Sequence, residues 1–115
     1  MRSKNFVQLL GHVGGDPETR RSETGEVFVT FSVATNSRWT DRSGTEHEET
    51  EWHDVICFGG LADLVAKFVK KGDPVLLEGR LRTRTWTDQA GMERRNTGIV
   101  ARDVTFLARR EDAAA

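Results

Sequence analysis

Apolar and polar residues alternate along most of this chain, which is the pattern of half-buried β-strands. We expect a first strand over residues 6–10, closed by a glycine-rich bend, and a tight turn at residues 23–26 that leads into a second strand over residues 27–35. The positions of the second strand expected to face the core are Val27, Val29, Phe31 and Val33. A polar loop over residues 40–50 separates this strand from a third one over residues 52–58.

The period changes after the third strand. From residue 61 to residue 71 the apolar residues recur at i, i+3, i+4 and i+7, which predicts one amphipathic helix. Its apolar face is expected to consist of Leu61, Leu64, Val65 and Phe68. We expect Lys70 and Lys71 in its last turn and Gly72 as its C-terminal cap.

Two more strands follow the helix. The segment 75–86 carries Val75, Leu77 and Leu81 on one face and Arg80, Arg82, Arg84 and Trp86 on the other. A hairpin tip at residues 88–91 leads to a last strand over residues 95–107. Three strands, a helix and two strands predict an all-β fold, a five-stranded OB-fold barrel with one α-helix between its third and fourth strands. We expect this domain to span residues 1–108 and residues 109–115 to form a disordered tail.

Length and composition fit a single globular domain. The 115 residues are 37% hydrophobic and 30% charged, and domains of about 100–150 residues are the most common. No apolar run approaches the roughly 20 residues of a membrane span, and no secretory signal is visible, so we expect a cytoplasmic protein. The single cysteine, Cys57, lies in an apolar run and is interpreted as a small buried hydrophobic residue.

Charge is segregated along the chain although the net charge is only −1. Residues 41–54 contain six acids and one base, whereas residues 80–95 contain five arginines and two acids. This distribution indicates one basic face on a nearly neutral molecule.

Exposed aromatic residues are the strongest candidate chemistry. Trp39 and Trp86 have polar neighbours, which favours exposed rings on which nucleic-acid bases can stack. Trp52 and Phe58 share a strand face, and their pattern is equally compatible with core packing and with stacking. Arginines at every second position before Trp86 could pair with phosphates.

Enzymatic chemistry finds little support. His47-Glu48 begins like the zinc motif H-E-x-x-H, but the second histidine is replaced by Glu51. The chain has neither the nucleophile motif G-x-S-x-G nor a phosphate-binding loop. We therefore predict no catalytic residue, no metal and no cofactor.

The most specific stretches of the sequence resemble one family. Phe31-Ser32-Val33-Ala34-Thr35, Thr50-Glu51-Trp52-His53, Phe58-Gly59-Gly60-Leu61-Ala62 and the run from Leu81 to Asp88 are similar to bacterial single-stranded DNA-binding proteins. The resemblance covers about residues 4–107. It implies sequence-independent binding and protection of single-stranded DNA in replication, recombination and repair by a homotetramer associated with the nucleoid.

The resemblance also implies roles for individual residues. Trp39, Trp52, Phe58 and Trp86 match the base-stacking positions, and Arg82, Arg84, Lys71 and Arg20 match basic positions along the DNA path. His53 matches a residue near the subunit interface. Thr85 stands where the family often has lysine, and the family's acidic tail is absent, so partners recruited through that tail are not expected.

Two other functions remain open at this stage. One is an OB-fold module that binds RNA or a replication protein partner, which would not need four stacking aromatic residues. The other is a metal-dependent nuclease, which would cleave DNA with magnesium or manganese.

Overall fold

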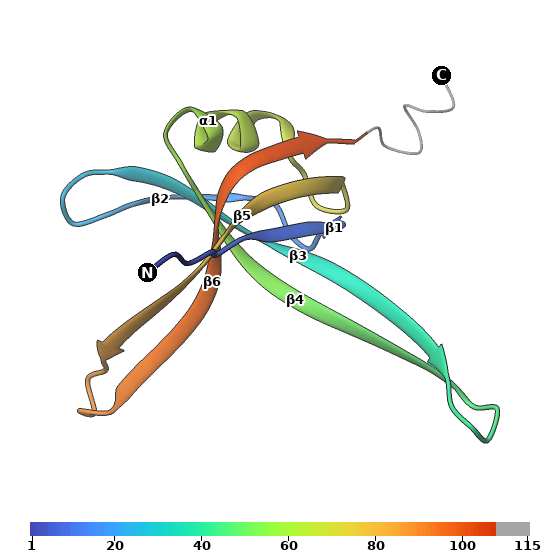
Figure 1. The fold of residues 1–115 in the computed structure, drawn as a ribbon. Helices are drawn as coiled ribbons and strands as arrows, with labels where there is room; N and C mark the ends of the chain where they lie inside the picture. Colours follow the sequence, from blue (N-terminus) through green and yellow to red (C-terminus); the bar gives the residue numbers. More distant parts are fainter. Residues whose placement is uncertain (108–115) are drawn as a thin grey trace.

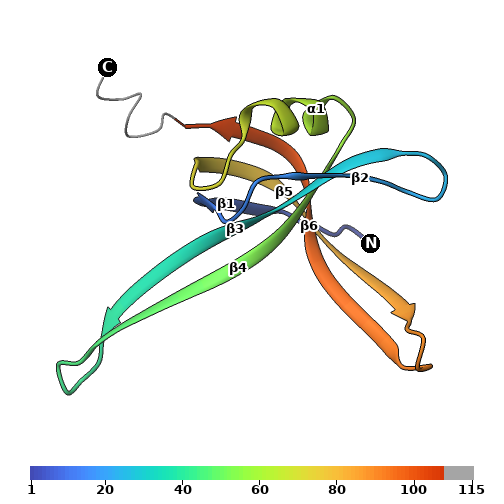
Figure 2. The same cartoon turned by 180° about the vertical axis from the view of Figure 1, so that it is seen from behind.

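A closed β-barrel with one helix at its side forms the body of the molecule, seen from two opposite sides in Figures 1 and 2. The computed structural model describes residues 1–107. Its strands are β1 (Val7–Val13), β2 (Glu18–Arg21), β3 (Val27–Thr40), β4 (Glu46–Phe58), β5 (Pro74–Thr87) and β6 (Glu93–Phe106). The helix α1 (Gly59–Phe68) connects β4 to β5.

Strand pairing closes the barrel. The strands follow the order β1-β5-β6-β4-β3, and β1 pairs again with β3, while the short β2 lies on the outer edge of β3. Neighbours are antiparallel except β4 and β6, which are parallel where Val55 lies opposite Ile99. This confirms the predicted five-stranded barrel with its helix between the third and fourth predicted strands, which are β4 and β5. The short β2 was not predicted.

The core consists of alternate residues from the barrel strands. Val29, Phe31 and Val33 of β3 are buried, as their alternation predicted. The prediction for Val27 is wrong, since 40% of this residue is exposed. Val27 lies opposite Arg21 in the β2–β3 hairpin, which extends beyond the barrel (Figure 1).

The predicted loop over residues 40–50 is largely strand. The paired strands β3 and β4 continue as a long arm beyond the barrel, up to the pair Thr40 and Glu46 (Figure 1). The Asp41 carboxylate closes the turn by accepting hydrogen bonds from the backbone N–H groups of Ser43 and Thr45. Both faces of this arm are exposed, so its sequence lacks the apolar alternation that identifies a half-buried strand. The tip predicted at residues 88–91 is confirmed at the end of the β5–β6 arm, where the Asp88 N–H bonds the Met92 carbonyl.

The helix is shorter than predicted, and only part of its predicted apolar face is buried. It ends at Phe68, so Gly72, with φ +89°, lies in the turn before β5 and is not the helix cap. Lys67 replaces Lys70 and Lys71 as the basic residue of the last turn. Ala62 and Val65 are buried, whereas Leu64 and Phe68 are 48% and 56% exposed. Val65 and the partly buried Leu61 confirm one half of the predicted face, and the buried residue that the pattern missed is the small Ala62.

The apolar face predicted for β5 is only partly buried. Val75 and Leu77 lie in the core, but Leu81 is 48% exposed because β5 leaves the barrel there and continues into the β5–β6 arm. The side chain of Asn5 bonds both the N–H and the carbonyl of Leu81. The predicted tail over residues 109–115 lies outside the described residues. No helix within residues 1–107 is long and apolar enough to cross a membrane.

Candidate nucleic-acid interface

One outward face of the sheet runs across β3 and β4. Residues directly opposite each other in an antiparallel pair point to the same side. The odd-numbered residues Val29, Val33 and Val55 point into the core, so the even-numbered ones point outward. The outward pairs are Phe28 with Phe58, Thr30 with Ile56, Ser32 with Asp54 and Ala34 with Trp52.

The same face continues onto the neighbouring strands. On one side, β2 places Glu18 opposite Thr30 and Arg20 opposite Phe28. On the other side, Val100 of β6 lies beside Ile56 of β4. The outward pairs between β5 and β6 are Arg80 with Val100, Arg82 with Gly98, Arg84 with Asn96 and Trp86 with Arg94.

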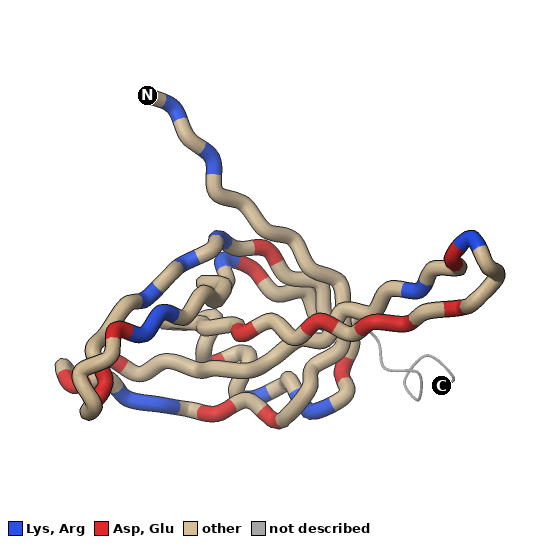
Figure 3. Tube along the Cα trace, turned by 90° about the horizontal axis from the view of Figure 1, so that it is seen from below, with Lys and Arg blue, Asp and Glu red and all other residues tan. Residues whose placement is uncertain are grey.

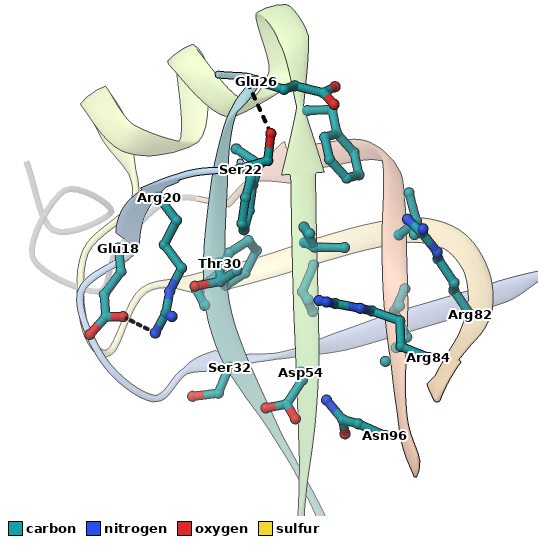
Figure 4. Close-up of a pocket in the computed structure, with 18 of the residues that line it drawn as sticks. Glu18, Arg20, Ser22, Glu26, Thr30, Ser32, Asp54, Arg82, Arg84 and Asn96 are labelled. Atoms are coloured by element: carbon teal, nitrogen blue, oxygen red, sulfur yellow. Dashed lines mark hydrogen bonds and ion pairs between the residues drawn. The ribbon is translucent and has the colours of Figure 1, made fainter. Parts of the chain in front are cut away.

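A groove of about 1260 Å³ follows this face (Figure 4). Four of the predicted DNA-binding residues, Arg20, Phe58, Arg82 and Arg84, line it together. They come from β2, β4 and β5, which are far apart in the sequence. Figure 4 shows Arg82 and Arg84 on one side of the β4 ribbon and Arg20 on the other.

Two predicted residues lie further along the same sheet face. Trp52 is 62% exposed on β4, beyond the groove, and Trp86 is 48% exposed near the end of the β5–β6 arm. These exposures fit the prediction of open rings and exclude core packing for Trp52. Phe58, in contrast, is half-buried in the groove.

The other three predicted residues lie outside the groove and away from this row of exposed rings. Trp39 points to the opposite face of the β3–β4 arm, where its ring stacks on His47 with centroids 5.3 Å apart. Lys71 lies in the turn after α1, and its backbone N–H donates to the carboxylate of Asp16, which lines the groove. His53 is half-buried on the face opposite Trp52, and its Nε2 shares a hydrogen bond of 2.9 Å with the Thr35 hydroxyl.

The groove also contains residues that the sequence analysis missed. Phe28 and Asn96 line it, as do several acids. Phe28 could have been found from its parity, because it alternates with the predicted core positions Val27 and Val29 and must therefore point outward. Asn96 lies on a strand arm without an apolar face, and its sequence carries no comparable signal.

The groove is of mixed charge. Its lining residues include four arginines and five acids, and the acids are Asp16, Glu18, Glu23, Glu26 and Asp54. Arg20 pairs with Glu18 at 2.8 Å, whereas no ion pair within residues 1–107 involves Arg82 or Arg84. Acidic residues are also frequent along the β3–β4 arm (Figure 3). The groove arginines that form no ion pair within residues 1–107 are therefore Arg82 and Arg84 on β5 and Arg21 on β2.

Nothing in the described part of the chain resembles a catalytic centre. No three His, Cys, Asp or Glu side chains among residues 1–107 are grouped so that they could hold a metal ion. Cys57 is fully buried, and desolvation raises the pKa of its thiol to about 12, which keeps it from acting as a thiolate nucleophile. The geometry offers exposed rings and guanidinium groups on one face, which is chemistry for binding.

Sequence comparisons assign the chain to a family. Residues 4–107 match the single-strand binding protein family, to which the chain therefore belongs. This is a family of non-enzymatic DNA-binding proteins, as predicted. The chain is 45% identical over 113 residues to single-stranded DNA-binding protein 1 of Xylella fastidiosa, covering 97% of this chain and 83% of the relative. It is 41% identical to the protein of the same name from Chlorobaculum tepidum, covering 96% of this chain and 68% of that one.

Two solved structures share the fold. One is a Plasmodium falciparum SSB complex with single-stranded DNA, with a TM-score of 0.84, 32% identity and coverage of 94% of this chain and 98% of that one. The other is a deletion mutant of the single-stranded DNA binding protein from Thermus aquaticus, with a TM-score of 0.80 and 27% identity. The match covers 95% of this chain and 53% of the Thermus chain.

Proposed function

We propose that this protein binds single-stranded DNA, independently of sequence, along the outward face of β2 to β6. Bases stack on Trp52, Phe58 and Trp86, and phosphates pair with Arg82 and Arg84. The observation that carries this proposal is that Phe58, Arg82 and Arg84 line one groove, while Trp52 and Trp86 expose their rings on the same sheet face. The similarity to a structure described as a complex with single-stranded DNA supports it.

Stacking is the main source of affinity in this proposal. A base stacked on an aromatic ring contributes about 1–3 kcal/mol, whichever base it is. The groove has no excess of positive charge, so electrostatic attraction alone gives weak binding. Arg82 and Arg84 then place the phosphates between the rings.

The remaining predicted residues extend the path. Trp39 meets DNA only if the strand crosses the edge of the β3–β4 arm, because its ring lies on the other face. Lys71 lies beside Asp16 at the rim of the groove, and Arg20 lies at the β2 end. All three belong to the proposed path at its periphery.

The proposal includes the role implied by family membership. The protein protects exposed single strands during replication, recombination and repair, as a homotetramer at the nucleoid in the cytoplasm. Two large apolar residues at β1 are exposed: Phe6, just before the strand, by 53%, and Leu10, within it, by 65%. Their exposure supports the association of several copies of this chain, which would bury them. His53 is the proposed interface residue.

A titration of oligo-dT against intrinsic tryptophan fluorescence tests the proposed function. Exposed rings that receive bases are expected to be strongly quenched, whereas duplex DNA of the same length has little effect because its bases are paired. Equal quenching by both DNAs refutes the stacking mechanism. Competition by RNA of the same length tests the alternative module, since RNA that displaces oligo-dT completely at equal concentration contradicts a DNA-specific role.

A further inference from the structure

We propose that Phe28 is an additional base-binding residue, and that Phe28, Phe58 and Arg20 together form a subsite for one nucleotide. The base stacks on the Phe58 ring with its edge toward Phe28, and its phosphate pairs with the Arg20 guanidinium. This inference rests on the proposed function. Its new element is Phe28, which neither the aromatic pattern nor the family resemblance indicated as a DNA-binding residue.

Three adjacent strands bring these residues together. Phe28 of β3 lies directly opposite Arg20 of β2 on one side and opposite Phe58 of β4 on the other. The three side chains therefore form one row on the outward face, and all three line the groove.

The two rings form a corner. Their centroids are 6.0 Å apart and their planes are inclined by 44°. One flat base cannot stack on both rings at this angle, but a base stacked on the Phe58 ring presents its edge to Phe28. Face contact with one ring and edge contact with a second are both favourable arrangements for aromatic groups.

Phe28 is not needed as a core residue. Its neighbours in β3, Val29 and Phe31, point into the barrel and are 1% and 7% exposed. Phe28 points the other way, is half-buried and lines the groove. A large apolar side chain on an outward, concave surface fits a ligand with an apolar face better than it fits water.

Arg20 is available to a phosphate at this position. Its guanidinium pairs with Glu18 at 2.8 Å, and both side chains are more than half exposed. Exposed ion pairs of this kind are weak, so a phosphate oxygen can replace the carboxylate and form a charge-assisted bond of similar geometry.

The test compares two phenylalanine pairs of the same geometry. Phe68 and Phe106 lie 6.1 Å apart with their planes inclined by 45°, but neither lines the groove. We expect Phe28→Leu to lower the affinity for oligo-dT about two- to tenfold, within the range of an edge-to-face aromatic contact, and to leave the salt dependence unchanged. The control Phe68→Leu is expected to bind like the parent protein. Thermal melting of both variants checks that the fold persists.

Photo-crosslinking separates direct contact from an indirect effect. Oligo-dT that contains 5-iododeoxyuridine is irradiated with the unmodified protein, and the crosslinked peptides are mapped. We expect a crosslink in the peptide that contains Phe28 as well as in the one that contains Phe58. A crosslink at Phe58 without one at Phe28 overturns the inference, even if Phe28→Leu does not fold.

The inference and the proposed function fail differently. If the parent protein binds oligo-dT and Phe58→Leu weakens binding while Phe28→Leu does not, only the two-ring subsite is wrong. If the parent protein does not bind oligo-dT, the proposed function itself is wrong.

Discussion

The ring of Trp52 lies against Gly14, in the space that a side chain at position 14 would occupy. A Cβ atom at this glycine would be 2.2 Å from Cζ3 of Trp52 and 2.7 Å from the hydroxyl of Ser32. Gly14 follows β1, whereas Trp52 and Ser32 lie on β4 and β3. The glycine-rich bend therefore supports one side of an exposed ring and fixes the orientation in which the ring can receive a base.

We expect Gly14→Ala to displace the Trp52 ring without unfolding the protein, because the clash is with side chains. A ring forced about 30° from its rotamer costs about 0.5–1.5 kcal/mol. Affinity for oligo-dT, measured by fluorescence titration, is expected to fall up to about tenfold. Gly15→Ala is the matched control, since no heavy atom of the described residues lies within 4 Å of its added Cβ. Equal affinities of Gly14→Ala and Gly15→Ala for oligo-dT would show that the orientation of the Trp52 ring does not affect DNA binding.

Glu18→Gln is expected to strengthen DNA binding by releasing Arg20. An exposed ion pair is worth about 0.2–1 kcal/mol, so affinity at low salt is expected to rise by roughly 1.5- to 5-fold. The control is Glu23→Gln, which removes the same charge from an acid that lines the groove but forms no ion pair with any residue in the range 1–107. Isothermal titration calorimetry at low salt compares them. An equal gain in both variants means that net charge, and not the release of Arg20, is responsible.

The tip of the β3–β4 arm is expected to remain ordered well below neutral pH. Hydrogen bonds from His47, then Ser43 and Thr45, lower the pKa of Asp41 from 3.8 to about 2. A carboxylate with a lowered pKa contributes its stabilisation in full above the unfolded value, near pH 3.8, and loses it as the pH falls toward 2. The protection of the Ser43 and Thr45 amides against exchange, measured by NMR relative to the intrinsic exchange rate at each pH, should therefore fall only below about pH 4. A fall in protection already between pH 6 and pH 5 contradicts this account of the turn.

We predict four chains per particle by light scattering at micromolar concentration. The physical reason is that a small barrel with exposed apolar residues at one edge gains buried surface through symmetric association. Replacing the half-buried His53 by Phe removes its hydrogen bond to Thr35 and is expected to make assembly depend on concentration. A stable monomer of the parent protein refutes the tetramer, and unchanged assembly of the variant on dilution removes the role of His53.

The barrel could be predicted from the sequence because its strands have one buried and one exposed face. Val29, Phe31 and Val33 alternate with polar or outward residues, and this period identifies both the strand and its core side. The outer half of β3, up to Thr40, is exposed on both sides, so no apolar period marks it. The helix face was only partly right because the periodicity of large apolar residues does not identify the small residue Ala62, which is buried.

The site could be predicted only in part for a related reason. Residue type identified Trp52, Phe58, Trp86 and the arginines of β5, but only the register between strands shows which of them share a face. Trp39 and Trp52 are both exposed tryptophans on one hairpin, yet their rings lie on opposite faces. Phe28 was missed because it stands among core residues, and its outward direction matters only once β2 and β4 lie beside it.

The central claim, that the outward face containing Arg84 and Trp86 is the DNA path, is tested most directly by the salt dependence of oligo-dT binding. For single strands the slope of log K against log salt is about −0.7 per phosphate contact, so Arg84→Ala is expected to flatten it by roughly that amount. Trp86→Ala is expected to cost on the order of 1–3 kcal/mol at every salt concentration and to leave the slope nearly unchanged. An unchanged slope for Arg84→Ala, or parent-like binding of Trp86→Ala at high salt, contradicts the assignment of this face.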